Sequence, residues 1–193
     1  MSNPSRKPDR LRRRLLAAAA ALPFAGSARG AELTLTPACG PQAPRTPSQT
    51  EGPYYTPDTP LRASLVEPGS RAARLVLSGR VVSAACAPVA GALLDFWHCD
   101  ERGEYDNAGF RYRGHQFADA DGRFRLDTIF PAIYPGRARH LHVKVQAPGG
   151  PILTTQLYFP GDARDGLWRR ELVVAMEARP GARVAAFQFI VDA

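Results

Sequence analysis

Two histidines separated by one residue, His140 and His142, are the side chains with the clearest potential for chemistry. Side chains at positions i and i+2 of a β-strand point to the same face, so both imidazoles would project together while Leu141 and Val143 face the opposite way. Adjacent imidazoles are suitable ligands for a borderline metal ion. An exposed histidine pair on a solvated face is the alternative, and the spacing alone does not decide between the two.

A metal held by two histidines needs further ligands, and the sequence offers two kinds. The usual iron(II) arrangement adds one carboxylate, for which Asp162 and Glu171 are candidates. Two tyrosines offer phenol oxygens instead: Tyr134 lies in a Tyr-Pro-Gly turn before the histidines, and Tyr105 lies further upstream. A free phenol has a pKa of about 10, so it becomes an anion near neutral pH only when a hard cation such as ferric iron binds it. Taken singly, each tyrosine is more simply explained as an aromatic residue at a strand end.

A series of short runs with alternating apolar residues must position these side chains. Turn sequences rich in glycine, proline and aspartate separate the runs, and no segment shows the period of an amphipathic helix. Roughly seven strands with a turn every dozen residues predict an all-β fold, an antiparallel β-sandwich of the immunoglobulin-like or Greek-key type. The expected strands are 75–84, 90–98, 122–128, 139–147, 153–159, 171–175 and 184–192.

The segment before these runs has a different texture. Residues 32–72 are rich in proline, threonine, serine and glycine and show no sustained period. We expect them to form an extended N-terminal arm that wraps the domain and contributes to the active-site mouth, with the catalytic β-sandwich at 73–193. A chain of 193 residues fits one such domain with a proper hydrophobic core.

Residues 1–31 have the composition of an export signal. Three consecutive arginines at 12–14 precede an apolar run over 15–25, and small residues follow through Ala31, as in secretory signal peptides. The run has roughly half of the ~20 residues that a membrane span requires, so no stable membrane insertion is expected. The arginines favour the twin-arginine route over an ordinary secretory signal, and hence a periplasmic or extracellular location.

The formal net charge of +7 does not point to a nucleic-acid partner. Seven of the 25 basic residues lie in residues 1–31, but only one of the 18 acidic residues does, so the rest of the chain is close to neutral. A nucleic-acid-binding domain keeps a basic face in its folded part. We therefore expect no nucleic acid among the partners.

Cys39, Cys86 and Cys99 are the three cysteines, and they lack zinc-finger spacing. In an oxidising compartment one pair can close. Cys39 and Cys86 lie in loop-like surroundings and are the favoured pair. The alternative is three unpaired thiols, with Cys99 buried beside the site.

Five motifs follow one another along the chain: Gly-Ala-Leu-Leu-Asp-Phe-Trp-His at 91–98 continuing to Tyr105, Ala-Asp-Ala-Asp-Gly-Arg-Phe at 118–124, Asp-Thr-Ile-Phe-Pro-Ala-Ile-Tyr-Pro at 127–135, Arg-Ala-Arg-His-Leu-His at 137–142 and Thr-Gln-Leu-Tyr-Phe-Pro-Gly-Asp at 155–162. Together they resemble the intradiol ring-cleavage dioxygenases, a family that includes protocatechuate 3,4-dioxygenases, catechol 1,2-dioxygenases and hydroxyquinol dioxygenases. The likeness runs in order from about Thr46 to the C-terminus. It implies an enzyme that cleaves catechol-type rings with O2 between the two hydroxyl-bearing carbons, giving cis,cis-muconate-type diacids.

The resemblance implies a non-haem Fe(III) cofactor and its ligands. Tyr105 and Tyr134 would be phenolate ligands, His140 and His142 would be imidazole ligands, and water or hydroxide would fill a fifth position. Tyr134 would be the axial phenolate that the substrate displaces.

The resemblance also implies two further catalytic residues. Arg137 matches an arginine that lies beside the ring as charge develops, and Gln156 matches a glutamine that orients substrate or oxygen. A plain surface role is the alternative for Arg137. Ala138 stands where the family often has proline, so the backbone after Arg137 is less constrained, and Arg139 should face away from the metal by strand alternation.

The arm resembles the family segment that passes the active-site mouth. Glu51, Pro53 and Tyr54 would line the substrate pocket, with a purely structural arm as the alternative. No residue securely recognises a ring carboxylate, so catechol, hydroxyquinol and protocatechuate all stay open as the aromatic diol. A homo-oligomer, which family members often form, is compatible with such an arm.

Two other functional classes remain open on the sequence. One is an oxygenase with Fe(II) or another metal, which would use both histidines and a carboxylate. The other is a non-catalytic β-sandwich that binds ligands or partners. The colour of a ferric phenolate and O2 uptake with catechols separate the three.

Overall fold

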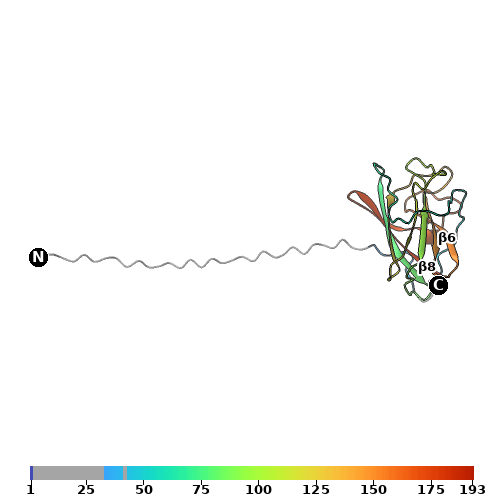
Figure 1. Ribbon diagram of the computed structural model, residues 1–193, viewed down its shortest axis with the longest axis horizontal. Coiled ribbons are helices and arrows are strands. Elements are labelled where there is room, and N and C mark those ends of the chain that lie inside the picture. Colours follow the sequence, from blue (N-terminus) through green and yellow to red (C-terminus); the bar gives the residue numbers. More distant parts are fainter. Residues whose placement is uncertain (2–32, 41–42) are drawn as a thin grey trace. The chain divides into compact units, whose positions relative to one another are not determined.

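The computed structural model describes Met1 and residues 33–40 and 43–193 (Figure 1). The leader expected at residues 1–31 lies outside the described residues, except for Met1. Within the described part, eight strands form two four-stranded sheets with the orders β4-β1-β8-β7 and β3-β2-β5-β6. The elements are β1 Arg74–Ser83, β2 Leu93–Trp97, β3 Arg113–Phe117, β4 Arg123–Ile129, β5 His140–Gln146, β6 Ile152–Tyr158, the 3-10 helix η1 Arg170–Leu172, β7 Ala175–Arg179 and β8 Ala182–Val191.

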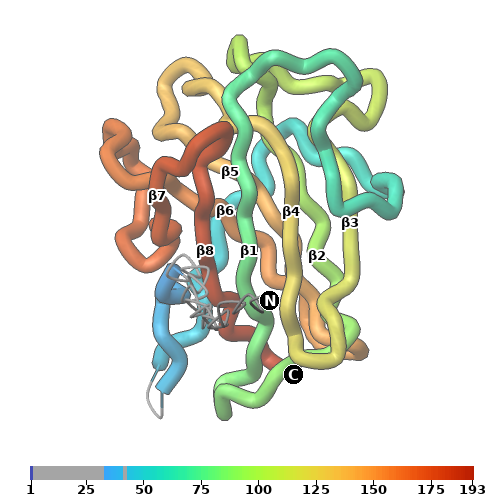
Figure 2. Tube along the Cα trace, turned by 90° about the vertical axis from the view of Figure 1, so that its left-hand side faces the viewer, coloured from blue at the N-terminus to red at the C-terminus, as the bar shows by residue number. Residues whose placement is uncertain are grey.

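The inner faces of the two sheets form one hydrophobic core, which confirms the predicted β-sandwich. In Figure 2, β7, β8, β1 and β4 follow one another from left to right in the first sheet. Alternate residues of each strand face inward, and burying each large apolar side chain contributes about 1.5–3 kcal/mol. The most deeply buried of these side chains include Leu77, Leu94, Phe96, Leu126, Leu141, Val143, Phe187 and Phe189.

The structure differs from the predicted strands in three places. β3 was not expected, because its sequence Arg-Gly-His-Gln-Phe lacks apolar alternation; it forms by antiparallel pairing along β2. The strand expected at 171–175 is wrong for most of its length, since η1 covers its start and β7 begins only at Ala175. Leu172 and Val174 are buried in alternation there, which imitates a strand. Finally, β1 and β8 pair in parallel, unlike the other strand pairs.

The described part of the arm contains no named strand but is bonded to both sheets. The amide of Thr46 donates to the carbonyl of Ile190 in β8, and the amide of Gln49 donates to Thr154 in β6. Further on, the amide of Leu65 donates to Asp127 in β4. These bonds satisfy backbone groups that would otherwise be exposed at sheet edges. The arm is thereby fixed along the path that leads it past the site.

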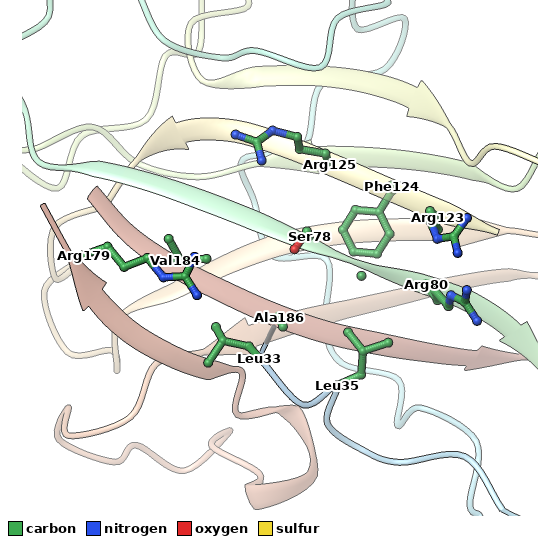
Figure 3. A pocket seen from close by; sticks show the side chains of 11 residues that line it. Leu33, Leu35, Ser78, Arg80, Arg123, Phe124, Arg125, Arg179, Val184 and Ala186 are labelled. Carbon is green, nitrogen blue, oxygen red and sulfur yellow. The ribbon is translucent and has the colours of Figure 1, made fainter. Parts of the chain in front are cut away.

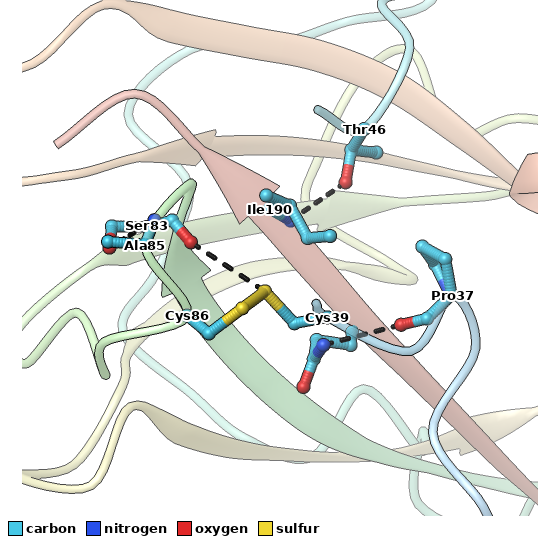
Figure 4. Close-up of a disulfide and its surroundings, with 8 residues drawn as sticks. Pro37, Cys39, Thr46, Ser83, Ala85, Cys86 and Ile190 are labelled. Carbon is cyan, nitrogen blue, oxygen red and sulfur yellow. Dashed lines mark hydrogen bonds between the residues drawn. A yellow bond between two sulfur atoms is a disulfide. The ribbon is translucent and has the colours of Figure 1, made fainter. Parts of the chain in front are cut away.

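A disulfide joins the start of the arm to the sandwich (Figure 4). It links Cys39 to Cys86, the favoured pair, across a sequence separation of 47 residues. Cys86 lies in the turn between β1 and β2, and Cys99 is a free, buried thiol. The same figure shows the hydrogen bond between Thr46 and Ile190 beside the disulfide.

No helix among the described residues is long and apolar enough to cross a membrane.

Candidate metal centre

One cross-strand row of side chains forms the base of the site. Strand pairing places Arg113 of β3 opposite Trp97 of β2, Trp97 opposite His142 of β5, and His142 opposite Gln156 of β6. Side chains of directly paired residues lie on the same face of a sheet, so this row faces away from the core. His140 lies two residues before His142 on the same face and pairs with Tyr158. The alternation predicted for the two histidines is therefore present in the structure.

The two imidazoles are buried and point their Nε2 atoms at one another. Each histidine is 3% exposed, and the Nε2 atoms are 3.1 Å apart. Nδ1 of His140 lies 2.7 Å from the carbonyl oxygen of Ala138, and because a carbonyl only accepts, Nδ1 carries the proton. The Nε2 atom of His140 therefore presents its lone pair to the space between the rings.

Burial keeps both imidazoles neutral. It lowers the pKa of His140 to about 4, although the hydrogen bond to Ala138 opposes the change. It lowers the pKa of His142 well below its usual value, and the nearby His140 and Arg137 lower it further. The neutral imidazole is the form that binds a metal ion.

Three tyrosines surround the histidines. The phenol oxygen of Tyr105 lies 3.2 Å from Nε2 of His140. The phenol oxygens of Tyr54 and Tyr134 are 2.7 Å apart, and the ring of Tyr54 stacks on that of Tyr105 with the centroids separated by 4.5 Å. Burial raises the pKa of Tyr105, and the hydrogen bond with Tyr134 raises that of Tyr54. Without a bound cation, Tyr105 is thus a neutral phenol.

These side chains line one small cavity of about 60 Å³. It contains all four expected metal ligands, the expected catalytic arginine, and two of the three arm residues proposed for substrate binding. Its lining residues are Gly52, Pro53, Tyr54, Tyr105, Tyr134, Arg137, His140 and His142.

The donor atoms in this cavity fit a metal ion. Two nitrogen ligands about 2.1 Å from one ion and at right angles lie about 3 Å apart, close to the observed separation between His140 and His142. Nδ1 of His142 is buried without a hydrogen-bond partner among the described residues. If that atom carries the ring proton, the two Nε2 lone pairs face each other, and a shared cation would remove their repulsion. The phenol of Tyr105 adds an oxygen donor at the same point.

The carboxylates proposed for the iron(II) alternative are engaged elsewhere. Asp162 accepts from Nε of Arg139 at 3.1 Å. Glu171 is exposed within η1. Among the described residues no three histidine, cysteine, aspartate or glutamate side chains form a metal-binding group. The structure therefore does not support a site of two histidines and one carboxylate.

Arg137 and Gln156 lie in one hydrogen-bond chain beside the histidines. Nη2 of Arg137 donates to Oε1 of Gln156 at 2.7 Å, and Nε2 of Gln156 donates to the carbonyl of Thr50 in the arm. Nε of Arg137 donates to Asp165 at 2.7 Å, and so does the amide of Ala138 at 2.8 Å. Burial pushes the pKa of Asp165 upward, but the hydrogen bonds from Arg137 and Ala138 outweigh it, and the pKa is lowered overall. Asp165 is thus an ionised member of the site.

Two site residues had no signal in the sequence. Asp165 lies in a loop without any periodic pattern. Arg113 is 1% exposed, and its guanidinium donates to the backbone carbonyls of Tyr54 and Asp106. It thereby ties the arm to the segment that carries Tyr105. A basic residue in a polar run gives no hint of such burial.

The structure does not bring Glu51 into the cavity. Its carboxylate pairs with Nζ of Lys144 at 2.6 Å, and the same ammonium lies 3.4 Å from the ring centroid of Tyr55. Pro53 and Tyr54 do line the cavity. The arm thus contributes two of its three predicted residues to the site.

A larger hollow of about 260 Å³ lies on the other sheet (Figure 3). Arg80, Arg123 and Arg125 line it together with Leu33 and Leu35 of the arm. It contains no histidine, tyrosine or carboxylate. None of the residues expected to carry chemistry lies there.

Comparison with known proteins agrees with the geometry. A family model described as "Dioxygenase" matches residues 50–188, a range that includes all four proposed metal ligands. A chlorocatechol 1,2-dioxygenase of Pseudomonas sp. (strain P51) is 30% identical over 173 residues, covering 74% of this chain and 68% of that protein.

Two solved structures are similar in fold and sequence. One is the dioxygenase domain of a dioxygenase carbohydrate-binding protein fusion from the cellulolytic bacterium Streptomyces sp. SirexAA-E, with a TM-score of 0.76 and 51% identity, covering 77% of this chain and 99% of that domain. The other is 3-chlorocatechol 1,2-dioxygenase from Rhodococcus opacus 1CP, with a TM-score of 0.70 and 29% identity, covering 76% of this chain and 72% of that chain.

Proposed function

The chain belongs to the intradiol ring-cleavage dioxygenases, and we propose that it opens catechol-type rings with a ferric ion held by Tyr105, Tyr134, His140 and His142. The observation that supports this proposal best is the convergence of two neutral imidazole nitrogens and the phenol oxygen of Tyr105 in one cavity. Two phenolates would offset most of the charge of Fe(III). Imidazole is a ligand suited to iron.

A ferric ion bound there would act as a Lewis acid and as a template for the two diol oxygens. The protein would then have to accept the protons that the diol loses. Tyr134 is suited to this step because its phenol oxygen already has a partner, the hydroxyl of Tyr54 at 2.7 Å. As a phenolate, Tyr134 would keep that hydrogen bond while its oxygen takes up a proton from the diol.

The size of the cavity indicates that side chains move when substrate binds. Its volume of about 60 Å³ is far below the roughly 300–1,000 Å³ of typical ligand pockets. Tyr134 and Tyr54 form one wall and belong to a turn and to the arm, not to a strand. We therefore infer that the phenol of Tyr134 swings outward to admit the ring.

Arg137 and Gln156 are proposed to act on the reacting ring and oxygen. Arg137 lines the cavity with its guanidinium linked to Gln156. A fixed positive charge beside the ring stabilises negative charge that develops on it during reaction. Gln156 is fully buried and bonded on both sides, so it offers a rigid polar group for orienting substrate or O2.

The proposed reaction incorporates both atoms of O2 into the substrate. The bond between the two hydroxyl-bearing carbons breaks, and each of these carbons becomes a carboxyl carbon that gains one oxygen atom. The product is a cis,cis-muconate-type diacid. Chlorocatechol 1,2-dioxygenases are among the relatives, and an uncharged catechol is the substrate class that this cavity suits best, because its one lining cation among the described residues already pairs with Asp165.

Export by the twin-arginine route, to the periplasm or beyond the cell, is also proposed. The Cys39–Cys86 disulfide supports it, because such bonds persist mainly in oxidising compartments. Cell fractionation tests the route: replacing the arginines at 12–14 with lysine should retain the protein in the cytoplasm. Unchanged export would point to an ordinary secretory signal.

Colour and oxygen uptake test the enzymatic proposal. The purified protein with stoichiometric iron should show a visible ferric–phenolate charge-transfer band that shifts on addition of catechol, and O2 consumption should match the diacid formed. A colourless protein with stoichiometric iron contradicts the phenolate ligands. A coloured protein that takes up no O2 with any of several catechols would favour a binding role.

A further inference from the structure

The loop after β6 places two carboxylates against the segment that leads into β5. Asp165 pairs with Arg137 at 2.7 Å, and Asp162 pairs with Arg139 at 3.1 Å. Both arginines precede the first proposed histidine ligand. The two ion pairs differ in their relation to the cavity, because Arg137 lines it and Arg139 does not.

The carboxylate of Asp165 is held on both of its oxygens. Oδ2 accepts from Nε of Arg137 and from the amide of Ala138, at 2.7 and 2.8 Å. Oδ1 accepts from the amides of Leu167 and Trp168, each at 2.8 Å. The side chain is 10% exposed. Four hydrogen bonds to one partly buried carboxylate fix its position far better than a surface ion pair would.

The peptide groups of Ala138 connect this carboxylate to the proposed metal site. The amide of Ala138 donates to Asp165, and the carbonyl of the same residue accepts from Nδ1 of His140. That second bond fixes which nitrogen of His140 faces the cavity. On the other side, the guanidinium held by Asp165 reaches Gln156. The carboxylate of Asp165 therefore contacts both the amide of Ala138, whose carbonyl orients His140, and the guanidinium of Arg137.

We propose that Asp165 is a positioning residue of this active site, which sets Arg137 directly and His140 through the backbone of Ala138. The expected effect of Asp165 on catalysis rests on the proposed function. It also gives a meaning to Ala138: a proline there has no amide hydrogen, so only a non-proline residue can make this bond to Asp165.

Kinetics of the iron-loaded enzyme with catechol provide the first test. Asp165→Asn should lower kcat/KM by about 10- to 100-fold, mainly through kcat, because Arg137 and His140 lose their fixed positions. Asp162→Asn is the matched control, since its carboxylate binds the arginine outside the cavity, and it should stay within about threefold of the wild type. Equal losses in both variants would overturn the proposal and indicate a general effect of the loop.

A double-mutant cycle separates positioning from stability. If Asp165 acts through Arg137, adding Asp165→Asn to Arg137→Met should cost far less than it does alone, because interacting residues are not additive. Full additivity would overturn the assignment. Should Asp165→Asn fail to fold, Asp165→Glu replaces it, because this variant keeps the charge but moves it by one methylene. The double-mutant cycle is then measured with Asp165→Glu and Arg137→Met.

The arginine side chain gives a readout that does not depend on turnover. In ¹⁵N NMR spectra of the metal-free protein, where no paramagnetic ion broadens the signal, the Nε–H of Arg137, identified by its loss in Arg137→Lys, should exchange slowly with water in the wild type and in Asp162→Asn. It should exchange at least tenfold faster in Asp165→Asn. Unchanged exchange contradicts the positioning role whether or not the enzyme is active. Fast exchange in that variant together with an inactive wild type would instead refute the proposed function alone.

Discussion

The indole ring of Trp97 lies almost parallel to the imidazole of His142, with the ring centroids 4.7 Å apart and an interplanar angle of 8°. The two residues are cross-strand partners on β2 and β5, so the contact follows directly from the register. Trp97 is 1% exposed. A large ring packed flat on a proposed ligand holds the imidazole of that ligand in one plane.

Replacing Trp97 should therefore weaken metal binding. Trp97→Leu removes the flat surface, and we expect the affinity for iron to fall by roughly tenfold or more, as for other residues that orient metal ligands. Competition with a chelator measures this. Trp97→Phe retains an aromatic face and should remain within a few-fold of the wild type. Wild-type affinity in Trp97→Leu would show that the strand alone orients His142.

The two tyrosines that share a hydrogen bond should respond differently to loss of their hydroxyls. Tyr134→Phe removes a proposed ligand and proton acceptor, so the charge-transfer band should change in position and intensity, and kcat should fall by roughly 100-fold. Tyr54→Phe removes only the partner at 2.7 Å and should leave the band of the resting enzyme nearly unchanged. Visible spectra and O2 uptake compare the two. An identical band in Tyr134→Phe and the wild type would remove that residue from the ligand set.

Charged substrates should be poor ones. The cavity's one lining cation among the described residues, Arg137, is already paired with Asp165, so a ring carboxylate would be buried without a partner, at considerable cost. We expect kcat/KM for catechol to exceed that for protocatechuate by more than about tenfold. Parallel O2-electrode assays test the ratio. A preference for protocatechuate would require a cationic group that the present arrangement does not supply.

Stability should fall in mild acid because of the buried residue His98. Its imidazole is bonded to the carbonyl of Cys99 and to the hydroxyl of Thr128, and burial lowers its pKa to about 4. Between pH 6.5 and 4 the unfolded chain takes up a proton at this residue and the folded chain does not, so the free energy of unfolding decreases as the pH falls. The contribution is about 3 kcal/mol.

Denaturant titrations at pH 7 and pH 4.5 measure this effect. His98→Gln cannot take up the proton and should lose less stability over this interval than the wild type. Other buried histidines titrate in both proteins, so the difference between the two is the informative quantity. Equal losses would assign the acid sensitivity elsewhere.

The disulfide should stabilise the fold without shaping the site. Closing a loop of 47 residues contributes about 4 kcal/mol through the unfolded state, so Cys39→Ser/Cys86→Ser should lower the free energy of unfolding by that order. After the disulfide, the arm is held to the sheets by hydrogen bonds from Thr46 onward. The iron spectrum should therefore stay unchanged. A shifted band in the double variant would show that the disulfide sets the position of the arm at the site.

The sequence predicted the parts of the site that depend on strand alternation. His140 and His142 could be placed on one face because a strand has a period of two, and the structure has them there. Tyr105 and Tyr134 lie outside strands, so only their resemblance to an ordered family pattern singled them out. Glu51 was assigned in the same way, and in the structure it pairs with Lys144 instead.

Residues that act through tertiary contacts could not be predicted. Asp165 and Ala138 are far apart in the chain and meet only because β5 and β6 are neighbours. Arg113 resembles any polar residue of an edge strand, yet it is fully buried and bonded to two carbonyls. The polar sequence of β3 also hid the strand itself, which forms because β2 offers it a complete ladder.

Arg113, Trp97, His142 and Gln156 form one cross-strand row. Because of this row, the strands should tolerate insertions and deletions far less well than the loops do. Inserting or deleting one residue within β2, β5 or β6 would turn the following side chains to the opposite face, moving imidazoles into the core and aliphatic groups into the cavity. The loops that carry Tyr105 and Asp165 have no such period. Insertions and deletions that preserve activity should therefore be confined to those loops, while the four strands of this sheet keep their length.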